Sequence, residues 1–227
     1  MFKFVSAAVV AVSLFPAAAG AQSFSRVLAA TDASLAGAFS SALKAPVTIK
    51  VSAPAAEKAA ATGSEYAPIA RAGVYIYEYS SNKFSGKRLL RFEYGPYSER
   101  DGLVTVTISF DDRTSPWTGT FQMQNGPDGV TAGGSTWGMA RLEMPNPVVY
   151  NYKWDEGNVQ NRIAAVNTTA TTPAGSFRNC VRILSRIDGG NTGTINRYYA
   201  PGVGLVMEQL ISRDKQETIT LLHYQLK

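Results

Sequence analysis

The sequence predicts a mainly β protein built on a strongly curved antiparallel sheet that curls towards a half-barrel. Two observations carry this prediction. Apolar residues recur with a period of two from Tyr66 onward, and clusters of turn-forming residues separate the alternating runs. No helical pattern alternates with these runs, which argues against a parallel α/β fold. A closed barrel and a sandwich remain alternatives.

Each alternating run has one apolar and one polar side, as expected for antiparallel strands with one wet face. The runs and further expected strands cover residues 74–79, 90–94, 104–110, 117–124, 148–154, 162–167, 177–187, 194–200, 203–211 and 217–226. Between the eighth and ninth of these elements, 194–200 and 203–211, Pro201 and Gly202 predict a type II turn. Gly204 is expected to relieve the twist of this turn as a bulge or a close backbone approach.

The N-terminal segment 1–21 has the features of a signal peptide. Lys3 supplies the positive start, residues 4–14 are apolar but too short to span a bilayer, and Ala19-Gly20-Ala21 forms a cleavage site. We therefore expect export to the periplasm or the medium of a bacterium. No later apolar run is long enough for a transmembrane segment, so the mature protein is expected to be soluble.

Residues 22–65 are predicted to be a helix followed by a low-complexity linker, and residues 66–227 to form the β domain. Large apolar residues recur at helical spacing between Phe24 and Leu43, whereas residues 52–64 are rich in alanine. A short strand is expected at 47–51. This N-terminal region is expected to have no core of its own, because it offers few large apolar side chains to offset the entropy of ordering.

The charge and the rarity of cysteine and histidine narrow the classes of function. The full chain carries a formal net charge of +5. Without residues 1–21 it carries +4, because that segment holds one Lys and no acid, and this mild excess does not indicate nucleic acid. Cys180 is the only cysteine and His223 the only histidine. The sequence therefore predicts no disulfide within the chain, no metal site and no cofactor.

Two motifs carry a resemblance to a known group of proteins. The stretch Thr-Pro-Ala-Gly-Ser-Phe at 172–177, with Cys180 three residues on, precedes Tyr-Ala-Pro-Gly-Val-Gly-Leu-Val at 199–206. Together they resemble a motif pair of uncharacterised secreted bacterial β proteins, whose architecture is similar to that of the LolA-like half-barrel carriers of lipoproteins and lipids. The resemblance implies a concave sheet that could hold a lipid-like ligand, as an analogy of fold.

Aromatic and cationic rows supply the candidate binding residues. Tyrosine and tryptophan suit the wall of a groove for an amphipathic ligand, although cross-strand pairing that stabilises the sheet is the more ordinary explanation. The candidate ligand-binding residues are Tyr75, Tyr77, Tyr79, Tyr150, Tyr152 and Trp154. The candidate contacts for anionic groups are Arg178, Arg182 and Arg186, whose alternative is a solvated face.

Recognisable catalytic residues are lacking. On a regular strand Cys180 shares a face with three arginines, which would favour its thiolate, and His223 could serve as a base. The alternative is an inert cysteine packed in the sheet or turned inward by a bulge. The sequence thus favours an exported non-enzymatic protein that binds a lipid-like or amphipathic ligand in a concave sheet. The alternative is a cell-envelope interaction or assembly module without a small-molecule ligand, which could hold an envelope protein. A thiol enzyme or hydrolase ranks third.

Overall fold

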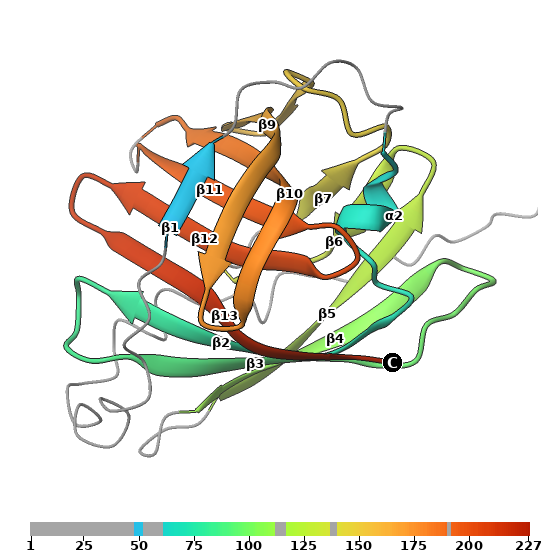
Figure 1. The fold of residues 1–227 in the computed structure, drawn as a ribbon, viewed down its shortest axis with the longest axis horizontal. Coiled ribbons are helices and arrows are strands. Elements are labelled where there is room, and N and C mark those ends of the chain that lie inside the picture. Colours follow the sequence, from blue (N-terminus) through green and yellow to red (C-terminus); the bar gives the residue numbers. More distant parts are fainter. Residues whose placement is uncertain (1–47, 52–60, 112–116, 137–139, 190–191) are drawn as a thin grey trace, which may run out of the picture.

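The computed structural model describes residues 48–51, 61–111, 117–136, 140–189 and 192–227 (Figure 1). The expected signal peptide and N-terminal helix lie outside the described residues, as does most of the expected linker. The one helix among the described residues is α2 (Gly63–Tyr66), a single turn. The expected strand at 47–51 is present as β1 (Thr48–Val51), which joins the main sheet by pairing with β9.

The remaining elements are all strands. They are β2 (Ala72–Ser81), β3 (Arg88–Tyr94), β4 (Leu103–Asp111), β5 (Trp117–Gly126), β6 (Gly129–Ala132), β7 (Arg141–Pro145), β8 (Lys153–Glu156), β9 (Val159–Thr172), β10 (Gly175–Ile187), β11 (Gly193–Ala200), β12 (Gly204–Ser212) and β13 (Gln216–Leu226).

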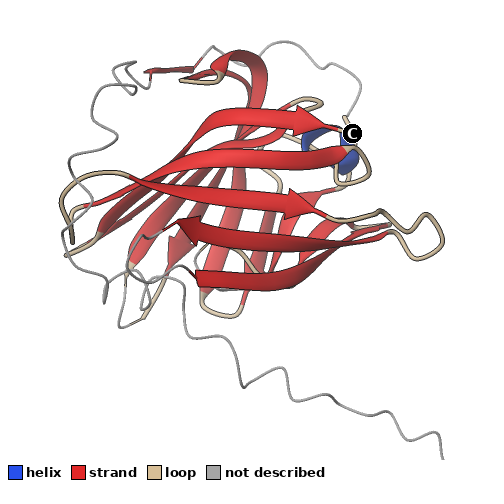
Figure 2. Cartoon of the chain, turned by 90° about the horizontal axis from the view of Figure 1, so that it is seen from below, coloured by secondary structure: helices blue, strands red, loops and turns tan. Residues whose placement is uncertain are grey.

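The strands form one antiparallel sheet that bends almost into a closed barrel (Figures 1 and 2). Its order is β1-β9-β10-β11-β12-β13-β2-β3-β4-β5-β6-β7, and β8 pairs with β9 beside this path. Register shifts interrupt the pairings β9–β10, β11–β12, β13–β2 and β6–β7. Such irregularities bend strands and increase their twist, which helps a long sheet to close. The predicted mainly β, strongly curved antiparallel sheet is confirmed.

The inner face of the sheet carries the core, and the alternation in the sequence shows which residues it holds. Along β2 the odd-numbered tyrosines point inward, and Tyr75 and Tyr77 pair with Phe92 and Leu90 on β3. The same inward positions continue on β4 with alternating Val, Ile and Phe residues, all of them buried. Burial of these side chains is the main stabilising term for such a sheet.

The hairpin of β9 and β10 is the longest in the fold, and β10 pairs with β11 from Val181 to Ile187, whereas the tip of the hairpin reaches β13 (Figure 1). Its tip is fastened to the sheet, because the Ala174 amide donates a hydrogen bond to the Leu221 carbonyl at 3.2 Å. Phe177 packs against Tyr224 with ring centroids 6.2 Å apart. The motif at 172–177 therefore forms the turn of a hairpin that covers part of the sheet.

The Pro201-Gly202 turn connects β11 to β12, as the sequence predicts. Gly202 has the expected positive φ of 72°, and Gly204 follows with φ 103°. The register shift lies slightly further on, where Tyr198 pairs with Met207 but Tyr199 pairs with Leu205. The extra residue is thus Val206, and the predicted wide connection is present with its bulge two residues beyond Gly204.

The prediction of a strand at 148–154 is wrong over most of this range. Only Lys153 and Trp154 belong to a strand, β8, which continues to Glu156. The preceding residues form a turn that begins after a cis Asn146–Pro147 bond and contains Asn151 at φ 67°. A left-handed residue interrupts a pleated strand, so the alternation of Tyr150 and Tyr152 does not reflect a strand face there.

Candidate functional site

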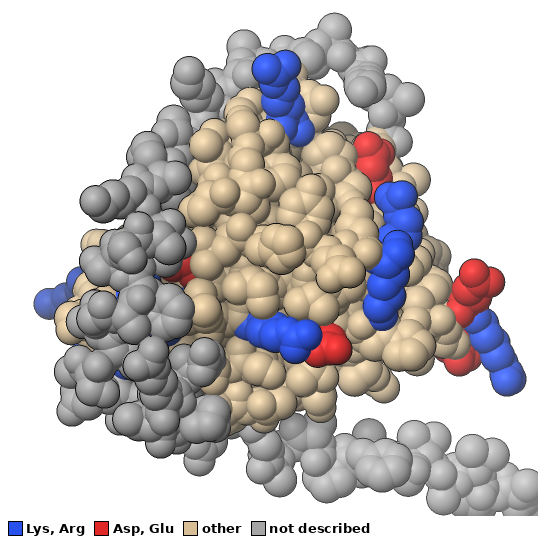
Figure 3. All heavy atoms as spheres, turned by 60° about the horizontal axis from the view of Figure 1, so that its bottom comes forward, with Lys and Arg blue, Asp and Glu red and all other residues tan. Residues whose placement is uncertain are grey.

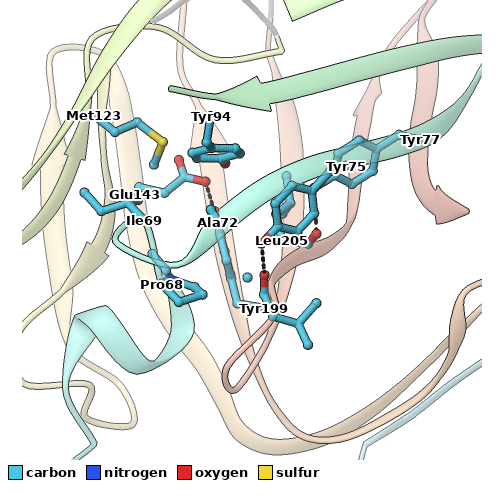
Figure 4. A pocket seen from close by; sticks show the side chains of 13 residues that line it. Pro68, Ile69, Ala72, Tyr75, Tyr77, Tyr94, Met123, Glu143, Tyr199 and Leu205 are labelled. Carbon is cyan, nitrogen blue, oxygen red and sulfur yellow. Dashed lines mark hydrogen bonds between the residues drawn. The ribbon is translucent and has the colours of Figure 1, made fainter. Parts of the chain in front are cut away.

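The predicted tyrosines of β2 lie in the interior of the barrel, each with at most 2% of its surface exposed. The hydroxyl groups of Tyr75 and Tyr77 donate hydrogen bonds of 2.8 Å to the carbonyls of Val203 and Leu205. The Tyr79 hydroxyl donates to the Glu217 carboxylate at 2.7 Å. The first bond connects β2 to the Pro-Gly turn and the second connects it to the start of β12, so these rings hold the turn against the core (Figure 4).

Two cavities beside these tyrosines measure about 20 Å³ each. Both are lined by Tyr77, Tyr94, Met123, Glu143 and Leu205. A volume of this size holds about one water molecule, whereas pockets for small ligands reach about 300–1,000 Å³. The interior around the tyrosines is therefore packed, and a ligand there would require the sheet to open. Ligand binding by Tyr75, Tyr77 and Tyr79 remains a prediction.

A buried ionic network lies next to these cavities. Arg141 on β7 donates to both oxygens of Glu143, with distances of 2.5 and 3.1 Å, and to Glu208 on β12 at 2.6 Å. The Tyr199 hydroxyl donates to Glu143 at 2.8 Å. The side chains of Arg141, Glu143 and Glu208 are only 10%, 8% and 0% exposed. Arg141 thus bridges two carboxylates that have little access to water, and its single charge balances one of the two.

Arg197 extends the network on β11, where it pairs across the sheet with Glu208. Its Nη2 atom donates to Asn161 Oδ1 at 3.1 Å and to Ser185 Oγ at 2.9 Å. Among the described residues its Nε and Nη1 atoms have no hydrogen-bond partner, and neither does Glu208 Oε2. Buried charges are costly unless paired, so opposite charges facing each other across two strands fit this interior.

The charge of Arg141 controls the ionisation of Glu143. Burial by itself would raise the pKa of Glu143, but the charge and hydrogen bonds of Arg141 outweigh burial and hold this pKa below its ordinary value. Burial raises the pKa of Tyr77 and Tyr199 well above the ordinary value for tyrosine. At ordinary pH, Glu143 in this network is therefore ionised, and the neighbouring Tyr77 and Tyr199 are neutral.

A third carboxylate, that of Glu156, links the two ends of the sheet. Glu156 on β8 accepts a hydrogen bond from the Leu142 amide on β7 and another, at 3.0 Å, from the Asn161 side chain on β9. β7 lies at the opposite end of the sheet order from β9 and its partner β8, so the side chain of Glu156 connects two parts of the sheet that no backbone pairing joins. The sequence analysis missed this residue and the ionic network, since neither is marked by local spacing.

A groove of about 340 Å³ lies on the outer face of β2–β5. The residues that line it include Ile76, Leu89, Arg91, Ser109, Trp117 and Thr118. Its wall is mostly apolar, and Arg91 at its side is paired with Glu93 at 2.8 Å. On the face shown in Figure 3, charges are sparse and several lie next to an opposite charge. The volume fits a small amphipathic ligand better than either interior cavity does.

The other predicted aromatic residues lie at the turn before β8. Tyr150 and Tyr152 are 55% and 43% exposed, whereas Trp154 is half-buried and its ring lies 5.8 Å from that of Tyr152. The structure therefore separates the predicted tyrosines into a buried set on β2 and an exposed set at this turn. The two sets do not form one wall.

The predicted arginine row of β10 and the Cys180 thiol do not lie on one exposed face. Arg178 and Arg186 are exposed and Arg182 is half-buried, but Cys180 is fully buried between two register shifts. The Cys180 thiol donates to the Phe177 carbonyl at 3.4 Å. His223 is exposed, because a register shift separates it from buried Leu221. The buried position of Cys180 matches the alternative stated for the sequence, an inert cysteine turned inward by a bulge.

We expect the Cys180 thiol of the native protein to resist labelling by Ellman's reagent at pH 7.5. Burial raises the pKa of this thiol to about 11, so the reactive thiolate is scarce, and the reagent has no access to the sulfur. The protein unfolded in guanidinium chloride, as the control, should release one equivalent of the thiol product. Stoichiometric labelling of the native protein within minutes would contradict this prediction.

Comparisons with known proteins concern the fold alone. No family model matches the chain, and no curated protein matches it. A "putative exported protein with YmcC-like fold" from Bacteroides fragilis is similar in structure, with a TM-score of 0.47, 14% identity, and coverage of 67% of this chain and 94% of that one. A "putative lipoprotein" from Parabacteroides distasonis has a TM-score of 0.44, 15% identity, and coverage of 75% and 100%.

Two kinds of feature are absent from the described residues. None of the described helices is long and apolar enough to cross a membrane. Within the same residues, no group of three or more His, Cys, Asp or Glu side chains is placed to hold a metal ion.

Proposed function

We propose that this protein is an exported, non-enzymatic interaction module of the cell envelope. The packed interior is the observation that supports it, because the cavities beside the inward tyrosines hold about one water molecule each. The side chains there are committed to internal hydrogen bonds and ion pairs. Binding would then use the outer surface of the barrel. The signal-peptide features of residues 1–21 support export.

Crosslinking in intact bacteria tests this proposal. The exported protein, expressed at its natural level, should form a discrete adduct with an envelope component, and the adduct should persist when Tyr77 is replaced by Phe in the interior. Recovery of monomer alone with crosslinkers of several lengths would count against the proposal. Mass spectrometry of organic extracts of the purified protein should find no stoichiometric ligand.

A second candidate function is the binding of a lipid-like or amphipathic ligand, and the outer groove favours it. Its volume of about 340 Å³ and its apolar side chains suit an acyl chain, and Arg91 could meet an acidic head group. If this function holds, a ligand should co-purify with the parent protein and should be absent from the purified Leu89→Glu variant, because Leu89 lines the groove. The matched control is Thr105→Glu, an exposed position on the outer face of β4, which should retain the ligand.

A further inference from the structure

We propose that the turn before β8, together with cations on β8 and β9, docks the protein onto an anionic phospholipid surface. This docking surface consists of Val149, Tyr150, Tyr152, Lys153 and Arg162. The inference goes beyond the proposed function, because a membrane surface is a contact in addition to any crosslinkable partner, and it rests on the export of the protein.

Exposed apolar side chains gather at this turn. Of the five large hydrophobic residues that stand out as exposed among the described residues, three are Val149 at 45%, Tyr150 at 55% and Tyr152 at 43%. Tyrosine has an apolar ring with a polar tip, which suits the head-group level of a membrane. Three such neighbours in one turn are more than the isolated exposed residues that any surface carries.

The turn is fixed in place rather than being a free loop. The Asn151 amide donates to the Ile163 carbonyl, and the Ile163 amide donates to the Tyr152 carbonyl, both at 2.9 Å. These bonds fix the backbone of the turn to β9 at Ile163, the residue that follows Arg162 in the chain. A rigid turn loses little conformational entropy when it binds.

Two cations face each other on β8 and β9, and one of them, Lys153, directly follows Tyr152 in the chain. Lys153 on β8 and Arg162 on β9 are directly opposite in the register, and both are exposed. Directly opposite residues have Cβ atoms about 4.5–5.5 Å apart, and like charges in such a pair are destabilising. Neither cation forms an ion pair within the described part of the chain.

The surroundings add a further cation and one acid. Arg186, exposed on β10, lies opposite Gln160, two residues along β9 from Arg162. Asp155, exposed on β8, lies opposite the same Gln160. The outer surface here thus carries three cations and one acid on neighbouring strands. An anionic lipid surface would relieve the repulsion between Lys153 and Arg162 and receive the tyrosine rings at the same time.

Vesicle co-sedimentation tests the docking surface. The protein purified after export, with its N-terminus established by mass spectrometry, is mixed with vesicles of 30% phosphatidylglycerol in phosphatidylcholine, or of phosphatidylcholine alone. We expect binding to the anionic vesicles only, weakened by 0.5 M salt. Each cation near the surface contributes a factor of about five, so Lys153→Ser/Arg162→Ser should bind about 25-fold more weakly. Tyr150→Ser/Tyr152→Ser should also bind more weakly.

The matched control is Lys83→Ser/Arg100→Ser, which removes two exposed cations that have acidic neighbours, Asp214 and Asp101. This variant should bind as the parent protein does. A Tyr150→Trp variant should show a blue-shifted emission with anionic vesicles. Equal binding to both vesicle types, no binding at all, or equal losses in control and test variants would overturn the inference. A crosslinked protein partner without vesicle binding would also overturn it while leaving the proposed function standing.

Discussion

Replacing Arg141 with methionine is expected to lower the free energy of unfolding by about 3–5 kcal/mol at pH 7. The substitution leaves Glu143 and Glu208 buried without the guanidinium that now bridges them at 2.5 and 2.6 Å. Two carboxylates in a low-dielectric interior repel each other and lack the water that would solvate them. Urea unfolding followed by far-ultraviolet circular dichroism measures the change.

A surface ion pair supplies the control for this prediction. Arg91 and Glu93 are 2.8 Å apart, but their side chains are 46% and 52% exposed. Arg91→Met should therefore cost at most about 1 kcal/mol. If Arg141→Met cost no more than Arg91→Met, the interior network would contribute nothing beyond an ordinary surface pair.

The pH dependence gives an independent check on the same network. The folded pKa of Glu143 lies below its ordinary value, so its contribution to stability is present above pH 4.5 and is lost as the pH falls through the lowered folded pKa. Without Arg141, burial should raise this pKa instead, and protonation would relieve the variant at acidic pH. The difference in stability between parent and variant should thus narrow from pH 7 to pH 4.

Alkaline unfolding is the second large effect that we expect. Burial raises the pKa of Tyr75, Tyr77, Tyr79 and Tyr199, whereas each tyrosine of the unfolded chain ionises at its ordinary value near 10. Above pH 10 the unfolded chain therefore releases protons that the folded protein retains, so stability falls as the pH rises. Four such groups give a slope of about 5 kcal/mol per pH unit, which approaches the whole stability of a domain within two units.

Absorbance at 295 nm, recorded beside circular dichroism, measures this effect. The buried tyrosines should ionise together with the loss of structure, in one cooperative step between about pH 11 and pH 12. Tyr75→Phe should make this step less steep by about one group. Tyr150→Phe, which changes an exposed ring, should leave the unfolding pH unchanged. Gradual ionisation of all tyrosines with the circular dichroism unchanged would show that the interior admits water.

The inward faces of the strands could be predicted from the sequence, because the direction of a side chain on a strand alternates with every residue. This local rule places Tyr75, Tyr77 and Tyr79 on one face. It fails where the backbone leaves the pleat. Asn151 at φ 67° breaks the expected alternation of Tyr150 with Tyr152, and the register shifts around Cys180 turn the thiol inward.

The sequence by itself determined the strand alternation, the Pro201-Gly202 turn and the mainly β class, since each depends on residues close together in the chain. Only the tertiary structure decided that the interior is packed and ionic. Arg141 and Glu208 are separated by 67 positions and meet because the sheet closes on itself. Closure depends on twist and bulges summed over all strands, so the space that remains inside cannot be obtained from the pattern of any one strand.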